Sequence, residues 1–161
     1  MTMQSEITGE GTPLVLIPGG LTGWLSWEPH AKILSTKRKV IRVQLLNVQY
    51  GLEAHPLPAD YSVKTESRAL AATLDEMGYT KPLDLVGWSY GALATLDYAL
   101  DHPDRVRTLT LIEPPALWVL RAHGTLDTET QKTVDLLETL HGDITEAQLE
   151  LFALNVGFVP P

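Results

Sequence analysis

Short runs of apolar and β-branched residues recur along the first 115 positions of the chain. The clearest runs lie at residues 13–18, 39–46, 82–88 and 106–112. Runs of this length that are apolar on both faces and bounded by Gly or Pro are typical of strands buried inside a sheet. A weaker pattern at residues 3–8 indicates a possible additional strand. The chain is therefore expected to form a sheet of four or five strands.

Helical patterns alternate with these runs. The clearest lies at residues 63–77, and two others are predicted at residues 27–34, capped by Ser26, and at residues 90–100. Residues 47–61 carry Gly and Pro and are expected to form a loop. Strands that alternate with helical crossovers predict an α/β fold, in which helices cover both faces of a mostly parallel sheet.

The alternation stops after residue 115, where two further helical patterns follow. The first is expected to end at Gly142, and the second carries an apolar stripe that reaches Phe158. Each opens with a capping-box pattern, Thr128 with Gln131 and Thr145 with Gln148. We therefore expect two domains, a sheet-containing core over residues 1–115 and a helical segment over residues 116–161.

Composition narrows the classes of function. The net charge is −8 and there are 12 basic residues against 20 acidic ones, so a nucleic-acid-binding surface or an anionic membrane surface is not expected. Cysteine is absent from the sequence, which excludes disulfides and thiolate chemistry. No signal peptide or membrane-spanning run is recognised, so a cytoplasmic protein is expected.

The strongest chemical signal is the sequence Gly87-Trp88-Ser89-Tyr90-Gly91, which fits G-x-S-x-G between a predicted strand and a predicted helix. Such a turn presents the serine on a strained backbone, and side chains two positions away would collide with neighbouring backbone. The helix N-terminus behind it can stabilise a developing oxyanion. Ser89 is therefore predicted to be a nucleophile, although an inert serine in a tight turn is the alternative.

Gly19 and Gly20 follow the first clear strand. We choose the Gly20 N–H as one oxyanion donor, with Leu21 as the alternative, and the Tyr90 N–H as the other. Taken alone, two glycines after a strand would be read as a plain turn.

The runs LVLIPGG, VGWSYGA and HPDRVRTLTLIEPP together resemble the N-terminal part of α/β-hydrolase-fold enzymes, over residues 12–115. Residues beyond them look like the start of a helical cap. The resemblance implies that Ser89 is the nucleophile and that Gly20 and Tyr90 form the oxyanion hole. The chain differs from many members in having Pro18-Gly19 where they have His-Gly.

In this family the acid and the histidine of the triad follow the serine in sequence. The strands that usually carry them are not recognised here, so the chain is expected to be the N-terminal piece of a longer protein. Glu113 occupies an alternative acid position that some haloalkane dehalogenases use. Among the five histidines, His123 in the expected cap is the least unsuitable base.

Leu21, Trp88 and Trp118 are candidate substrate-binding residues, although packing is the preferred interpretation for both tryptophans. The histidines and carboxylates lack metal-ligand spacing, and neither a dinucleotide fingerprint nor a P-loop lysine is present. No metal and no cofactor are therefore expected.

The leading hypothesis is a serine hydrolase that acts on an ester-like carbonyl of a small-molecule substrate through an acyl-serine intermediate. A cofactor-free perhydrolase or acyltransferase would use the same scaffold. A non-catalytic protein that binds a small ligand near Ser89 would need no histidine. An exposed edge of the strand at residues 106–112 would also permit a homo-oligomer.

Overall fold

The computed structural model describes residues 1–139 and 144–157. The chain divides into two compact units, Met1–Pro115 and Ala116–Pro161, which are described separately. Gly142 and Phe158, which were expected in the two last helices, lie outside the described residues.

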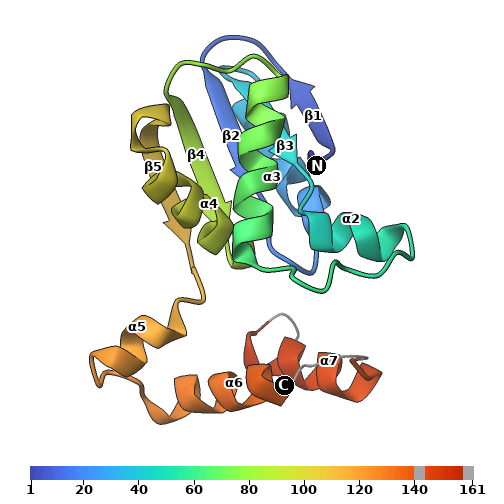
Figure 1. The fold of residues 1–161 in the computed structure, drawn as a ribbon, viewed down its shortest axis with the longest axis vertical. Helices are drawn as coiled ribbons and strands as arrows, with labels where there is room; N and C mark the ends of the chain where they lie inside the picture. The colour runs from blue at the N-terminus through green and yellow to red at the C-terminus, as the bar shows by residue number, and fades with distance from the viewer. Residues whose placement is uncertain (140–143, 158–161) are drawn as a thin grey trace. The chain divides into compact units, whose positions relative to one another are not determined.

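The first unit is built on one sheet of five strands in the order β1-β3-β2-β4-β5 (Figure 1). β1 pairs antiparallel with β3, and the other neighbouring pairs are parallel. The predicted α/β fold with a mostly parallel sheet is thereby confirmed, including the weakly indicated first strand. The strands are β1 (Ser5–Thr8), β2 (Pro13–Ile17), β3 (Lys39–Val43), β4 (Leu83–Trp88) and β5 (Val106–Ile112).

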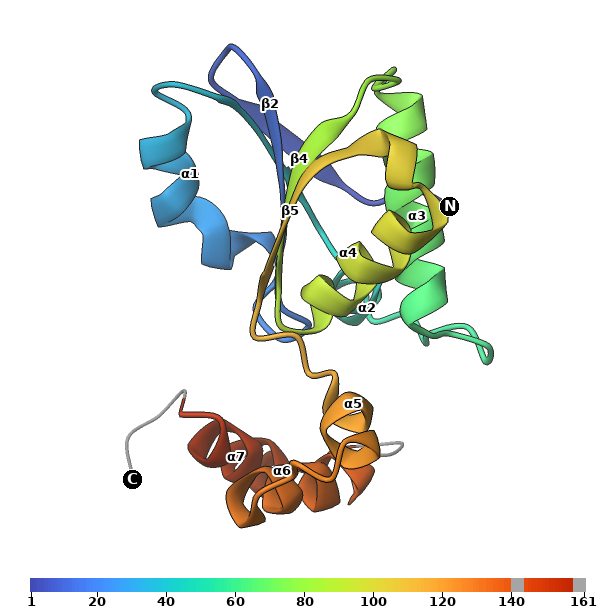
Figure 2. The ribbon, with the colours of Figure 1, turned by 90° about the vertical axis from the view of Figure 1, so that its left-hand side faces the viewer.

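Helices lie on both faces of this sheet. Seen along its edge, the sheet has α1 on one side and α3 and α4 on the other (Figure 2). The helical elements of this unit are η1 (Gly23–Trp27), α1 (Glu28–Leu34), α2 (Leu46–Leu52), α3 (Val63–Glu76), α4 (Tyr90–Asp101) and η2 (Pro103–Arg105).

The alternation of side chains along β2 divides the core into two layers. Leu14 and Leu16 pack with Trp27 and Ala31 on the side of α1. Val15 and Ile17 belong to a larger cluster that contains residues of α3 and α4. A strand with two buried faces must be apolar throughout, which explains the continuous apolar run at residues 13–18.

The segment after β3 differs from the prediction. β3 ends at Val43 rather than at residue 46, and residues 46–52 form the helix α2 instead of a loop. The carboxylate of Glu66 accepts hydrogen bonds from the first two N–H groups of this helix, those of Leu46 and Asn47. A capping group 20 positions away in the sequence leaves no local pattern, so Gly51 suggested a loop.

The start of the first helix was also predicted incorrectly. Ser26 does not cap it, because its hydroxyl donates to the carbonyl oxygen of Gly23 at 2.7 Å inside the 3-10 turn η1. α1 then begins at Glu28, with Pro29 in its first turn.

The second unit contains α5 (Leu117–Ala122), α6 (Thr128–Thr139) and α7 (Glu146–Asn155). α5 was not predicted. At α6 the capping group is Asp127 rather than Thr128, because its carboxylate accepts from the Thr130 N–H at 2.7 Å. The predicted capping box of Thr145 and Gln148 is confirmed at α7. Among the residues described, no helix has the length and apolar character needed to cross a membrane.

Candidate functional site

Two loops meet at the carboxyl ends of β2 and β4. The chain leaves β2 for β3 on one side of the sheet and returns to β4 on the other, which makes this a topological switch point. Ile17 pairs with Gly87 across the two strands, so the segment after Ile17 lies beside the turn that contains Ser89. Crevices at such points are where open α/β sheets bind their ligands.

Ser89 has a strained backbone conformation. It stands between β4 and α4 with φ of 52° and ψ of −126°, a region that L residues rarely occupy. Its N–H donates to the carbonyl oxygen of Ile112 in β5 at 2.9 Å, which ties the turn to the neighbouring strand. The side chain is half-buried.

The two glycines of the motif are required by close contacts. A Cβ atom at Gly91 would lie 2.1 Å from the carbonyl oxygen of Pro18, and one at Gly87 would lie 2.5 Å from the hydroxyl of Thr95. No side chain fits at either distance, so only glycine lets α4 and the loop after β2 approach the turn so closely.

Gly20 and Tyr90, the two expected oxyanion donors, are neighbours. A Cβ atom at Gly20 would lie 3.3 Å from the Cβ and Cδ1 atoms of Tyr90. Tyr90 is the first residue of α4, so its N–H has no acceptor within the helix. The carbonyl oxygen of Gly20 accepts a hydrogen bond of 2.8 Å from the side-chain amide of Asn47.

Glu113 lies next to the same turn. It directly follows β5, whose last residue Ile112 pairs with Trp88, and it has a positive φ of 48°. Its side chain is exposed. The structure therefore brings Glu113 to the edge of the sheet beside Ser89, and its role as the acid stays a prediction.

The histidines of the first unit contact other residues. His30 packs edge-on against Trp27, His55 lies beside Tyr50 and Glu53, and His102 lies against Tyr98. Within residues 1–115, none is hydrogen-bonded to Ser89. His123 is exposed at the end of α5, and His141 lies outside the described residues.

The candidate substrate-binding residues have different surroundings. Trp88 packs edge-on against Trp27 with ring centroids 6.4 Å apart, in the core layer on the side of α1, which agrees with the packing interpretation. Leu21 is 54% exposed in the loop after β2. Trp118 is 59% exposed on α5, in the second unit.

The sequence interpretation missed a buried polar network beside these loops. Glu66 is fully buried on α3 and accepts a hydrogen bond of 2.5 Å from the hydroxyl of Tyr61, whose side chain also interacts with that of Tyr90. Burial and the carboxylate of Glu66 raise the pKa of Tyr61 far above its usual range, and burial raises the pKa of Tyr90. The one available signal was a glutamate beside the buried stripe of an amphipathic helix.

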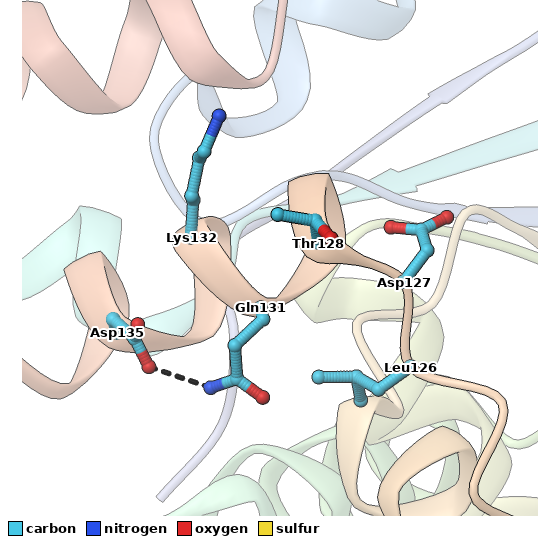
Figure 3. A pocket seen from close by; sticks show the side chains of 6 residues that line it. All are labelled: Leu126, Asp127, Thr128, Gln131, Lys132 and Asp135. Carbon is cyan, nitrogen blue, oxygen red and sulfur yellow. Dashed lines mark hydrogen bonds between the residues drawn. The ribbon is translucent and has the colours of Figure 1, made fainter.

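The second unit has a hollow at the start of α6 (Figure 3). The polar groups around it are engaged locally, because the side-chain amide of Gln131 donates to Asp135 and the ammonium group of Lys132 pairs with Glu129. The remaining lining residues are Leu126, Asp127 and Thr128. Across residues 1–139 and 144–157, no three His, Asp or Glu side chains come together in a way that could hold a metal ion.

Comparison with known proteins agrees with this geometry. Residues 12–149 match the family described as alpha/beta hydrolase fold. The chain belongs to this family. Relatives include the 2-hydroxy-6-oxo-2,4-heptadienoate hydrolase of Pseudomonas putida, which is 36% identical over 107 residues, covering 65% of this chain and 38% of the relative.

Two other relatives match similar shares of this chain, at 36% and 32% identity. A putative carbamate hydrolase RutD of Klebsiella pneumoniae is 36% identical over 111 residues. The match covers 63% of this chain and 38% of the hydrolase. A pimeloyl-[acyl-carrier protein] methyl ester esterase of Methylococcus capsulatus is 32% identical over 108 residues. The match covers 66% of this chain and 39% of the esterase. The chain thus spans about two fifths of the length of these relatives.

Solved structures show the same fold. A thermophilic esterase from Thermogutta terrifontis superposes with a TM-score of 0.59 at 23% identity, over 68% of this chain and 39% of the esterase. An epoxide hydrolase from Bacillus megaterium gives a TM-score of 0.65 at 14% identity, over 83% of this chain and 48% of that structure.

Proposed function

We propose that this chain carries the nucleophile and the oxyanion hole of a serine hydrolase that acts on an ester-like carbonyl. The observation that carries the proposal is the backbone of Ser89, held at φ of 52° between β4 and α4 and opposite the loop of Gly19 and Gly20. A strain of this kind persists only where the surrounding structure enforces it, and it is concentrated at functional sites. The methyl ester esterase among the relatives supports ester chemistry.

The reaction follows from these positions. The Oγ atom of Ser89 adds to the carbonyl carbon while its proton passes to a base, and the carbonyl oxygen becomes an oxyanion. The N–H groups of Gly20 and Tyr90 bind that oxyanion, and such a donor contributes about 3–4 kcal/mol to transition-state stabilisation. Collapse of the intermediate expels the alcohol, which takes the proton from the base. Water then adds to the carbonyl carbon of the acyl-serine while its proton passes to the base. Collapse of this second intermediate releases the carboxylic acid and returns the proton to the Oγ atom of Ser89.

The base is the part of this mechanism that residues 1–115 do not supply. We assign it to a histidine of the second unit or of a longer chain, with Glu113 as a candidate acid to orient it. We also propose that residues 116–161 form the first part of a helical cap segment. A non-catalytic protein that binds a small ligand is the competing function, because it would need no histidine.

Replacement of the nucleophile tests the proposal. In the full-length protein, Ser89→Ala should lower the turnover of short p-nitrophenyl esters by about 10⁴-fold or more. A fluorophosphonate should label Ser89 in the unchanged protein, as located by peptide mass spectrometry. Ser35→Ala is the matched control, because the Ser35 hydroxyl bonds only to the carbonyl oxygen of Lys32 at the end of α1. Unchanged turnover in Ser89→Ala would exclude the acyl-serine mechanism.

Residues 1–161 expressed alone separate the remaining alternatives. Little turnover is expected from them, because no histidine of the first unit is bonded to Ser89. Substantial turnover that is lost in His123→Ala would instead identify His123 as the base. Absence of turnover and of labelling in the full-length protein would favour the ligand-binding alternative.

A further inference from the structure

Glu66 is a buried carboxylate without a basic partner. Its exposed fraction is 0%, and within residues 1–115 no Lys, Arg or His side chain forms an ion pair with it. Three donors satisfy it instead: the N–H groups of Leu46 and Asn47, each at 2.9 Å, and the Tyr61 hydroxyl at 2.5 Å. A carboxylate removed from water is costly unless it is well hydrogen-bonded, so this arrangement needs an explanation beyond packing.

One set of contacts leads from Glu66 to the loop after β2. Its two oxygens hold the first turn of α2, and that turn carries Asn47. The side-chain amide of Asn47 donates to the carbonyl oxygen of Gly20 at 2.8 Å. The orientation of the Gly20 backbone therefore depends on a helix whose start is fixed by Glu66.

A second set of contacts leads from Glu66 to the turn after β4. The Tyr61 hydroxyl donates its proton to Glu66, and the Tyr61 side chain also interacts with the side chain of Tyr90. Tyr90 follows Ser89 directly, and its Cβ atom lies against Gly20. Both paths thus end on the two residues that supply the proposed oxyanion donors.

We propose that Glu66 is a positioning residue that fixes the spacing of the Gly20 and Tyr90 N–H groups. The proposal rests on the function proposed above, because only a hydrolase reaction gives these two N–H groups an oxyanion to bind. A carboxylate suits this position better than an amide, since its two oxygens can accept all three hydrogen bonds and an amide would place an NH₂ group against a donor. Glu66 is fully buried and its hydrogen-bond partners are Leu46, Asn47 and Tyr61 rather than Ser89, so it acts through the groups that it holds.

Two variants of the full-length protein test the proposal, and a third serves as the control. Glu66→Gln keeps the shape but sets its NH₂ group against one of the three donors. Tyr61→Phe removes the link to Tyr90 and leaves the capping of α2 in place. Thr73→Val is the matched control, because Thr73 is also buried on α3 and accepts the N–H of Met3 at 2.8 Å, without contact to Asn47, Tyr61 or Tyr90.

Kinetics distinguish positioning from a purely structural role. With active sites counted by fluorophosphonate titration, Glu66→Gln and Tyr61→Phe should lower kcat by about 10- to 100-fold and change KM less than about twofold. The inhibition constant of a trifluoromethyl ketone, which forms a tetrahedral oxyanion on Ser89, should rise by the same factor as kcat falls. Thr73→Val should lower the melting temperature and leave kcat per active site unchanged.

Backbone amide signals in NMR spectra give a readout that does not depend on catalysis. The Gly20 and Tyr90 amide signals should shift in both test variants and stay in place in Thr73→Val. If the unchanged protein shows no Ser89-dependent turnover, the proposed function fails. The amide signals alone then decide whether Glu66 fixes the positions of the Gly20 and Tyr90 backbone. Unshifted signals in both variants, or kcat values within twofold of the unchanged protein, would overturn the proposal.

Discussion

Gly91 ends the G-x-S-x-G motif and also lies in close contact with the loop after β2. A Cβ atom there would lie 2.1 Å from the carbonyl oxygen of Pro18, well inside the contact distance of carbon and oxygen. The position of a Cβ atom is fixed by the backbone, and the carbonyl oxygen that it would meet is itself backbone, so the collision cannot be relieved by rotating a side chain. The close approach of α4 to the loop after β2 therefore depends on the absence of a single methyl group.

Gly91→Ala should lower the free energy of unfolding by about 2–3 kcal/mol, as expected for overpacking in a rigid place. Urea unfolding followed by circular dichroism measures this. Gly51→Ala is the matched control, since a Cβ atom there meets nothing within 4 Å. Because Gly51 lies in α2, this control should raise the stability by about 0.5–1 kcal/mol. Equal stability of Gly91→Ala and the unchanged protein would show that the contact with Pro18 is not as close as described.

At this scale the sequence predicted Ser89, Gly20, Tyr90 and Glu113, and the structure places all four around one edge of the sheet. Their catalytic roles remain predictions. Glu66 was not predicted, because its partners Leu46, Asn47 and Tyr61 are separated from it by five to 20 positions and share no motif. Local spacing predicts a turn, whereas a tertiary hydrogen-bond network has no comparable signature in a single sequence.

At the scale of elements, Asp84 links the amino-terminal end of β4 to β5 and to the residue that precedes β3. Its carboxylate accepts two hydrogen bonds from the guanidinium group of Arg107 and one from the hydroxyl of Thr108, both on β5, and it also pairs with Arg38 before β3. These bonds, those of Arg107 first, hold the pKa of Asp84 well below its usual range, although burial opposes them. Asp84 therefore stabilises the folded state in its charged form.

Asp84→Asn should lower the free energy of unfolding by about 2–3 kcal/mol near neutral pH, because it removes charge-assisted hydrogen bonds. A lowered folded-state pKa gives stability that is present above the unfolded value of about 3.9 and is lost as pH falls below it. The difference in the free energy of unfolding between Asp84→Asn and the unchanged protein should thus become smaller below about pH 4. Urea unfolding over a pH series measures it.

Asp60→Asn removes the same charge from an exposed loop and is the control for net charge. Its unfolding free energy should follow that of the unchanged protein throughout the series. If the loss of unfolding free energy in Asp84→Asn stays constant from neutral to acidic pH, the charge of the Asp84 carboxylate is not its cause.

The elements themselves were largely predictable. The apolar runs predicted β2, β4 and β5, and the amphipathic stripe at residues 63–77 predicted α3, because burial on one or both faces imposes a visible period. α2 and α5 were missed. Neither has a local start signal such as the proline in the first turn of α1, and α2 depends instead on capping by Glu66.

At the scale of the whole first unit, the two edges of the sheet differ. β1 is a four-residue edge strand that runs antiparallel to its neighbour, and short edges of this kind resist further pairing. β5 is longer, with seven residues, and within residues 1–115 its outer edge has no partner strand. Most of its residues are exposed, including Leu109 and Ile112. An exposed strand of this length with apolar side chains can pair with another copy.

We therefore predict that residues 1–161 expressed alone self-associate through β5. Their weight-average mass in sedimentation should rise above 17.7 kDa between micromolar and millimolar concentrations. Thr110→Lys should suppress the rise, because a lysine on an edge strand opposes pairing with a second copy. Thr36→Lys adds the same charge at an exposed turn after α1 and should leave the rise unchanged. If Thr110→Lys associates as strongly as Thr36→Lys, the contact lies elsewhere, and the exposed apolar residues of the second unit, such as Trp118 and Leu151, become the next surface to alter.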